Sequence, residues 1–227
     1  DLSTDTRLVL VNALYYLGEW VYPFDPHDTY DDTFYGAHSD NSVPFMHDTR
    51  YMDYIQDDLF QAISMPFKDD DGNEGPYAMV IILPNEDSSV SEALNYLSTP
   101  QASNIFDAAQ NTRIELSLPK FEFEYGLSMT EHLQDLGIHR AFSEDAQFDS
   151  MAGSDNDLYI SDVVHKTYIR VDEEGAEAAA VTVVEMDTTM MPIEEETIEF
   201  NANRPFIFAI YDTTDNTVIF VGVASDL

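Results

Sequence analysis

Residues Val163–Pro192 read VVHKTYIRVDEEGAEAAAVTVVEMDTTMMP. The first ten of them predict a β-strand, and the polar break Glu173-Glu174-Gly175 ends it. Small and β-branched residues follow from Ala176 to Val184, without proline or further glycine, and a strand tolerates that composition. The acidic ends of this stretch instead suit an exposed connection. We therefore predict a segment that can be either a connection or a strand.

Alternate positions of this segment differ in charge. The even positions from 176 to 188 are Ala, Ala, Ala, Thr, Val, Met and Thr, whereas Glu177, Glu185 and Asp187 occupy odd positions. Because successive side chains of a strand face opposite sides, one face of the segment is uncharged and could be buried. Taken alone, the pattern also suits an ordinary solvent-exposed strand, so both interpretations stay open at this point.

Four stretches of the chain resemble the serpins, the family of serine protease inhibitors. The hinge of the serpin reactive-centre loop carries the pattern found here at Glu173, Glu174, Gly175, Ala176, Glu177, Ala178, Ala179 and Ala180. The other three stretches are LVLVNALYYLGEW (Leu8–Trp20) with PFDP (Pro23–Pro26), LSLPKFEFEYGL (Leu116–Leu127) and NRPFIFAIYDTTDNTVIFVGVAS (Asn203–Ser225). They occur in serpin order, and the resemblance covers nearly all of the chain.

The resemblance implies an α+β protein with the serpin fold, built from multi-stranded β-sheets and a few helices. We expect residues 1–227 to form a single serpin domain with an exposed reactive-centre loop at about 173–192. In serpins a substantial helical region precedes the block that starts here at Leu8. The chain therefore resembles the C-terminal part of a serpin, with the N-terminal helical part missing.

The resemblance also implies a function. An inhibitory serpin acts as a suicide substrate, whose cleaved loop inserts into the main sheet, and an alanine-rich hinge is typical of such members. The family spacing from Gly175 places the scissile bond at Thr189–Met190, with Met190–Met191 as second choice. Because the tip of the loop has no Arg or Lys, we expect a chymotrypsin-, elastase- or subtilisin-like target protease. We also expect the inhibitor to be a monomer. The alternative is a non-inhibitory serpin that binds a partner or acts as a chaperone.

Four polar or aromatic residues outside the hinge acquire structural roles through the same resemblance. Asn12 and His165 match a polar cluster beneath the central sheet, where the strands part to admit the loop. Trp20 and Lys120, together with Glu173, match positions that interact at the open end of the sheet. From the sequence alone, Trp20 is a core anchor and His165 is a core histidine with satisfied hydrogen bonds.

The charge of the chain is strongly unbalanced. The sequence contains nine Lys and Arg residues and 44 Asp and Glu residues, so the formal net charge is −35. Such a charge argues against nucleic acid or an anionic membrane as partner. It also destabilises a fold in low salt by self-repulsion, which salt screens. We expect a protein of a halophilic archaeon, with improved solubility as the alternative explanation.

Motifs for other chemistries are absent from the sequence. It has no G-x-S-x-G, H-E-x-x-H, Walker or G-x-G-x-x-G pattern and no cysteine. The acidic run Asp69–Asn73 invites a calcium interpretation, but it lacks the alternate spacing and closing Glu of an EF-hand, so a solvated hairpin turn is the default. We therefore expect no enzyme, no metal and no cofactor.

Three further segments of the chain carry local signals. The apolar run RLVLVNALYY (residues 7–16) predicts a strand buried on both faces. Ser128 and Glu131 predict a capping box for a helix that stops at Gly137. No apolar run reaches transmembrane length and no signal peptide begins the chain. We expect an extracellular location, with the cytoplasm as the alternative.

Overall fold

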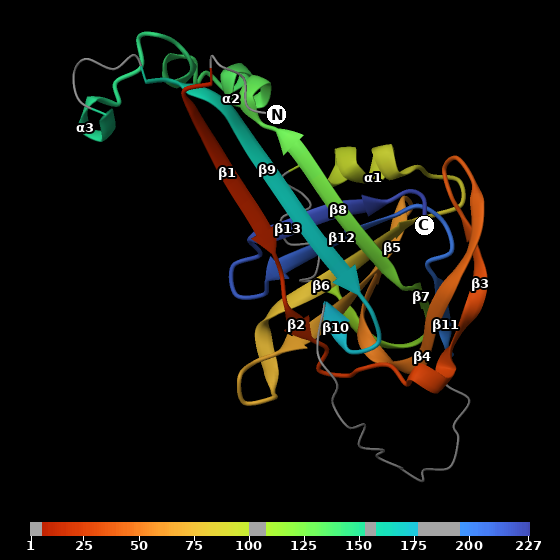
Figure 1. The fold of residues 1–227 in the computed structure, drawn as a ribbon. Helices are drawn as coiled ribbons and strands as arrows, with labels where there is room; N and C mark the ends of the chain where they lie inside the picture. Colours follow the sequence, from red (N-terminus) through yellow and green to blue (C-terminus); the bar gives the residue numbers. More distant parts are fainter. Residues whose placement is uncertain (1–5, 100–107, 153–157, 177–195) are drawn as a thin grey trace. The chain divides into compact units, whose positions relative to one another are not determined.

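The computed structural model describes residues 6–99, 108–152, 158–176 and 196–227 (Figure 1). The chain divides into two compact units, which are described separately. The first unit combines Asp1–Tyr16 with Glu122–Ile169, and the second combines Leu17–Phe121 with Arg170–Leu227. None of the helices in the described ranges is both long and apolar enough to cross a membrane.

The first unit is built on strand β9 (Ile160–Val171), whose last two residues belong to the second unit. Strand β1 (Leu8–Tyr15) runs parallel to β9, and β8 (Phe121–Ser128) also pairs with it. The short helices of this unit are α2 (Thr130–Asp135), the 3-10 turn η3 (Arg140–Phe142) and α3 (Asp149–Ala152).

Strand β1 is less buried than its sequence predicts. Among the described residues it pairs with β9 alone, and the side chain of Val11 is 67% exposed. The expectation of a strand buried on both faces is therefore wrong for the described part of the chain. An apolar sequence shows only that its side chains favour burial. In the described part of the chain, no element packs over both faces of β1.

Helix α2 begins without the predicted capping box. Its N-terminal cap is Met129, which makes no side-chain capping bond, and the Ser128 hydroxyl donates instead to the Asp162 carboxylate at 2.6 Å. Asp162 lies on the neighbouring strand β9, so a tertiary contact has replaced the local one. The predicted stop is confirmed, because Gly137 follows the helix at a φ of +95°.

The second unit contains an eight-stranded sheet in the order β11-β7-β4-β5-β6-β12-β13, with β3 paired to β4. The long apolar runs of β6 and β12 lie inside the sheet and are buried almost throughout, as such runs predict. The strands are β3 (Thr29–Tyr35), β4 (Asp40–Gln56), β5 (Phe60–Lys68), β6 (Glu74–Pro84), β7 (Gln110–Pro119), β11 (Ile198–Asn201), β12 (Phe206–Asp212) and β13 (Val218–Ala224).

One helix covers part of this sheet. Helix α1 (Val90–Leu97) begins with a capping box between Ser89 and Glu92, and its Ala93 is buried against residues of β5, β6 and β12. A short 3-10 turn, η1 (Pro26–Asp28), precedes β3. Two-residue strands β2 (Gly18–Glu19) and β10 (Gly175–Ala176) complete the second unit and lead directly to the candidate site.

Candidate functional site at the hinge

The chain reverses direction in the four residues Asp172–Gly175. Strand β9 ends at Val171, and Ala176 returns to pair antiparallel with that same residue. The backbone N–H of Asp172 donates to the Gly175 carbonyl at 3.0 Å, which closes the turn. The predicted hinge therefore starts as a tight hairpin attached to the end of β9.

Glycine is required at the end of this turn. Gly175 has a φ of +155°, which L side chains rarely adopt, and a Cβ at this position would lie 2.0 Å from the Gly18 carbonyl oxygen. The close approach exists because β10 pairs antiparallel with β2, where Gly175 faces Glu19 and Ala176 faces Gly18. Gly175 and Ala176 of the predicted loop thus form a short strand between the end of β9 and β2.

Trp20 holds the hinge from one side. Its ring stacks on Phe67 with centroids 4.6 Å apart, and its indole N–H donates to the Asp172 carbonyl at 3.0 Å. Its backbone N–H donates to the Glu174 carbonyl at 2.9 Å. Since Trp20 is only 1% exposed, it is a core anchor as predicted, and it contacts the hinge through two hydrogen bonds.

The carboxylate of Glu173 is bound from the other side. It accepts a hydrogen bond from Lys120 Nζ at 2.6 Å and one from the Thr29 hydroxyl at 2.8 Å, while its backbone carbonyl accepts from Phe24 N–H at 2.9 Å. Burial raises the pKa of Glu173, but the Lys120 and Thr29 bonds outweigh it and hold this pKa below its ordinary value. The structure thus brings Trp20, Lys120 and Glu173 to one place. The sequence did not predict the contacts that Thr29 and Phe24 make with Glu173.

Asn12 and His165 form a separate pair in the first unit. They face each other in the register of β1 and β9, with Asn12 Nδ2 and His165 Nδ1 3.2 Å apart. Asn12 is exposed and His165 is half-buried, so His165 is not the fully buried core histidine that its sequence context suggests.

The remaining predicted site residues lie outside the described ranges. They are Glu177, Ala178, Ala179 and Ala180 of the hinge, and Thr189, Met190 and Met191 at the two candidate scissile bonds. Within the described residues, no group of three or more His, Asp or Glu side chains could hold a metal ion. In the acidic turn, Asp69 accepts hydrogen bonds from the backbone N–H groups of Asp71 and Asn73, as in a hairpin turn.

Arg50 supports the segment that follows Trp20, a role that the sequence did not reveal. Its guanidinium donates to the Tyr22 carbonyl, lies 3.1 Å from the Asp48 carboxylate and covers the Phe24 ring at 4.9 Å. Burial lowers the pKa of Arg50, which the nearby Asp48 partly offsets. Because Phe24 donates to Glu173, Arg50 stabilises a neighbour of the hinge.

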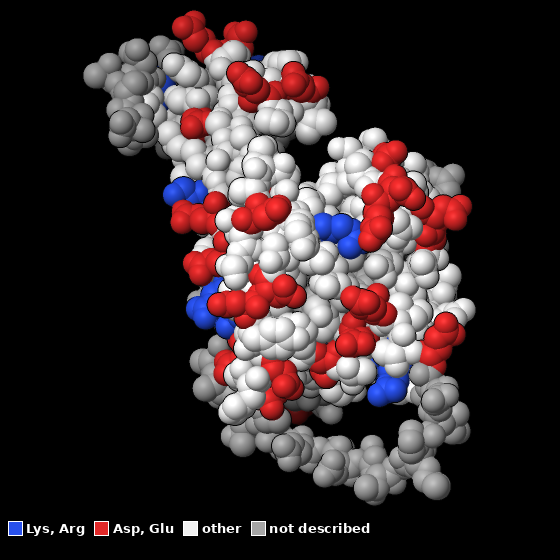
Figure 2. Space-filling view, turned by 90° about the vertical axis from the view of Figure 1, so that its right-hand side faces the viewer, with Lys and Arg blue, Asp and Glu red and all other residues white. Residues whose placement is uncertain are grey.

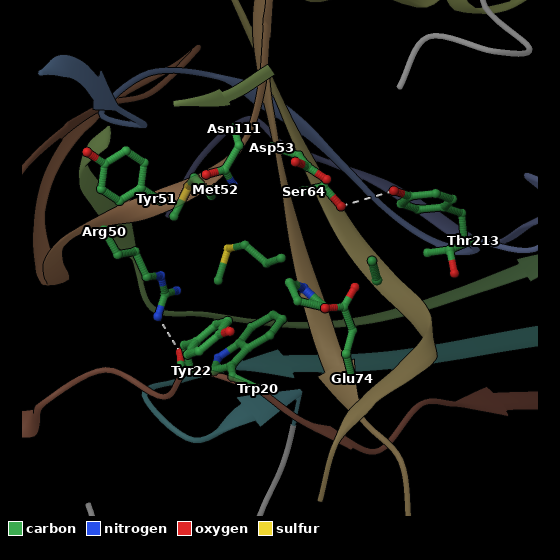
Figure 3. A pocket seen from close by; sticks show the side chains of 14 residues that line it. Trp20, Tyr22, Arg50, Tyr51, Met52, Asp53, Ser64, Glu74, Asn111 and Thr213 are labelled. Carbon is green, nitrogen blue, oxygen red and sulfur yellow. Dashed lines mark hydrogen bonds between the residues drawn. The ribbon is translucent and has the colours of Figure 1, made fainter. Parts of the chain in front are cut away.

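A cavity of about 300 Å³ opens between Trp20, Arg50 and the strands of the sheet (Figure 3). The Ser64 and Tyr211 hydroxyls lie 3.0 Å apart in its wall, and Asp53 and Glu74 also line it. Burial raises the pKa of Tyr211, and these two carboxylates raise it further. Since the charge of Arg50 is already paired with Asp48, the cavity has an excess of negative charge.

The structure thus pairs two residues of the predicted loop, Gly175 and Ala176, with its neighbouring strands as the short strand β10. Consistently, the sequence model of the family described as Serpin (serine protease inhibitor) matches residues 1–227. The chain belongs to the serpin family, and the predicted fold class is thereby confirmed.

Similar proteins extend this result. The chain is 36% identical over 221 residues to an uncharacterized serpin-like protein of Thermococcus kodakarensis, covering 97% of this chain and 50% of that protein. It is 33% identical over 229 residues to a serine protease inhibitor of Cyanea capillata, covering 98% and 58%. The native structure of the thermophilic serpin tengpin matches with a TM-score of 0.83 at 33% identity, covering 100% and 57%. The chain thus spans about half the length of the curated relatives it matches.

Proposed function

We propose that this chain belongs to an inhibitory serpin that acts on a serine protease by a suicide-substrate mechanism. The target attacks the exposed loop and forms an acyl-enzyme, and the freed loop then inserts into the main sheet as a new strand. The observation that carries this proposal is the hinge itself, because Gly175 and Ala176 already form a strand paired with the end of β9. Further insertion would extend a ladder that has started.

The proposed insertion has a sufficient driving force. About fifteen inserted residues at ~3.3 Å each extend over about 50 Å. With about 1 kcal/mol per net hydrogen bond, the new ladders would contribute on the order of ten kcal/mol, which is comparable to the stability of a whole domain. The parallel pairing of β1 with β9 over Leu8–Tyr15 would have to part, and that opposes the gain.

The partner in this proposal is a chymotrypsin-, elastase- or subtilisin-like protease, because the loop tip contains Thr and Met and no basic residue. The scissile bond is Thr189–Met190, with Met190–Met191 as second choice. The inhibitor acts extracellularly as a monomer, and its hinge residues gate and anchor the loop without catalysing a reaction.

The test uses the whole protein encoded by the gene, in molar salt, incubated with a subtilisin- or chymotrypsin-like protease and followed on a denaturing gel. We expect an SDS-stable complex, and mass spectrometry of the released peptide identifies the scissile bond. Ala178→Arg should shift the product from complex to cleaved inhibitor, because position 178 lies on the uncharged face of the segment. Ala179→Arg is the matched control, since its side chain lies on the opposite face. Equal product ratios for the two variants would contradict the insertion mechanism.

A second candidate function is a non-inhibitory serpin that binds a small partner. The cavity beside Trp20 favours it, because its size reaches the lower end of ligand pockets and its carboxylates suit a cationic group. Clean cleavage of the loop, without a covalent complex and without a gain in thermal stability, would favour this second function over the first.

A further inference from the structure

Asp172 makes polar contacts with four different residues around the hinge. Its backbone N–H donates to the Gly175 carbonyl at 3.0 Å, and its backbone carbonyl accepts from the Trp20 indole at 3.0 Å. One carboxylate oxygen accepts from the Glu174 N–H at 3.0 Å, and the other lies 3.1 Å from the Arg170 guanidinium. The residue is only 7% exposed, so its carboxylate depends on these partners for compensation of its charge.

The contact with Glu174 has a specific geometric meaning. Asp172 is the first residue of the four-residue turn, and its side chain accepts the N–H two residues further on. This arrangement imitates a backbone turn and stabilises the reversal of the chain. Arg170, which lies two residues before Asp172 on β9, orients the carboxylate through the second oxygen. The turn is therefore formed by a side chain that is itself held in place.

We propose that Asp172, oriented by Arg170, is a positioning residue that preforms the hinge turn and thereby sets how readily the cleaved loop inserts. This inference rests on the proposed inhibitory function. It concerns a residue outside the hinge signature and outside the contacts of Glu173 with Lys120 and Thr29.

The preformed turn matters because insertion resembles the closing of a hairpin. The pair Val171–Ala176 is the first rung beside β9, and each further loop residue would add to the ladder from there. If the turn were disordered, the entropy of ordering it would oppose the first rungs and insertion would slow. Insertion competes with hydrolysis of the acyl-enzyme, so slower insertion yields cleaved inhibitor in place of complex.

The test compares three variants at the hinge with a matched turn elsewhere. Asp172→Ala removes both carboxylate contacts, Asp172→Asn keeps an acceptor for the Glu174 N–H, and Arg170→Gln removes the orienting charge. The control is Asp212→Ala, because Asp212 accepts from the Thr214 N–H at 2.8 Å in the turn between β12 and β13. The Asp212 turn has the same local chemistry but lies outside the hinge.

Two measurements are made on the whole protein. Hydrogen exchange of the Glu174 amide reports the turn directly, and a denaturing gel reports the ratio of complexed to cleaved inhibitor. For Asp172→Ala we expect exchange to rise by about tenfold or more, as for the loss of a hydrogen bond to a charged group, and the product to shift toward cleaved inhibitor. Asp172→Asn should remain near wild type, Arg170→Gln should lie between them, and Asp212→Ala should change neither readout.

Two results would overturn the inference. Unchanged Glu174 exchange in Asp172→Ala would show that the carboxylate does not shape the turn. Faster exchange with an unchanged product ratio would show that the turn does not control insertion. If Asp172→Ala fails to fold, as judged by Trp20 fluorescence, Arg170→Gln carries the same test with a smaller expected shift. If wild type forms no complex, the proposed function fails and the insertion step fails with it, while exchange still decides the role of Asp172 in the turn.

Discussion

Lys120 Nζ lies 2.6 Å from Glu173 Oε2, joining the segment between β7 and β8 to the turn that follows β9. The two residues are 53 positions apart in the sequence. Their side chains are 31% and 12% exposed, so the pair is partly shielded from water. This contact ties the hinge to the large sheet of the second unit and leads to the first prediction.

Removal of the Glu173 charge should destabilise the protein in a pH-dependent way. The folded pKa of Glu173 lies below the ordinary value of about 4.3, so the stability from its ionised form is present above that value and is lost as pH falls through the folded pKa. The difference in unfolding free energy between wild type and Glu173→Gln should therefore have its largest value near pH 7 and decrease below about pH 4.3. Urea unfolding at several pH values, with Glu174→Gln as charge control, measures it. A difference independent of pH would contradict the ion pair.

Gly175→Ala should disrupt the hinge. The required φ of +155° costs a non-glycine residue about 1–3 kcal/mol, and the new methyl would also clash with the Gly18 carbonyl. Hydrogen exchange should accelerate at Trp20 and Phe24, whose N–H groups donate to the hinge. Gly126→Ala is the matched control, because a Cβ added at Gly126 would meet, among the described residues, only the Lys166 side chain, at 3.8 Å. Equal exchange in both variants would argue against the close approach.

Trp20→Phe separates the stacking of Trp20 from its hydrogen bond. A phenyl ring can still stack on Phe67, but the Asp172 carbonyl loses the indole donor in a buried site. We expect a loss of about 1–3 kcal/mol of unfolding free energy, measured by circular dichroism in urea. Tyr22→Phe, at an exposed ring, should change stability by much less. If the two variants are equally stable, the indole hydrogen bond contributes nothing measurable.

His38 and Asp226 should titrate as a pair. His38 Nδ1 lies 2.9 Å from one Asp226 carboxylate oxygen, and this hydrogen bond raises the pKa of His38 above 6.5 while lowering that of Asp226. In an NMR titration, Asp226→Asn should return the His38 pKa toward its ordinary value, whereas Asp25→Asn should leave it unchanged. An unaltered His38 titration in Asp226→Asn would mean that the pair does not persist in solution.

Salt should stabilise the folded chain. Figure 2 shows one face on which acidic side chains are numerous and basic ones few, in keeping with the net charge of −35. The screening length falls from about 10 Å at 0.1 M to about 3 Å at 1 M, so the repulsion between these carboxylates weakens. The melting temperature should rise between 0.1 M and 1 M KCl. A fall or no change over that range would contradict adaptation to high salt.

Local sequence signals predicted several elements correctly. Glu173-Glu174-Gly175 indicated the break at which β9 ends, and Gly137 indicated the residue at which the chain leaves helix α2. These predictions succeeded because periodicity, turn chemistry and the glycine requirement act over a few neighbouring residues. The family resemblance added the pairing of Trp20, Lys120 and Glu173, which no local pattern contains.

Other predictions failed where tertiary contacts compete with local ones. Ser128 had the spacing of a helix cap, yet its hydroxyl binds Asp162, which is 34 positions away. The apolar sequence of β1 predicted burial, whereas the side chain of Val11 is mostly exposed. A hydroxyl or an apolar side chain has the same local preference in either environment, so its sequence context cannot choose between them.

The sequence by itself predicted three features of the hinge: a turn of acidic residues, a glycine that follows them, and a segment whose even positions carry no charge. The tertiary structure decided the contacts that hold this hinge, including those of Thr29 and Arg50, which no sequence pattern indicated. Thr29, Arg50, Lys120 and Trp20 reach it or its neighbours across separations of up to 152 residues. Such contacts depend on how the strands pair and pack, because a turn encodes its own shape but not the partners that the rest of the chain brings to it.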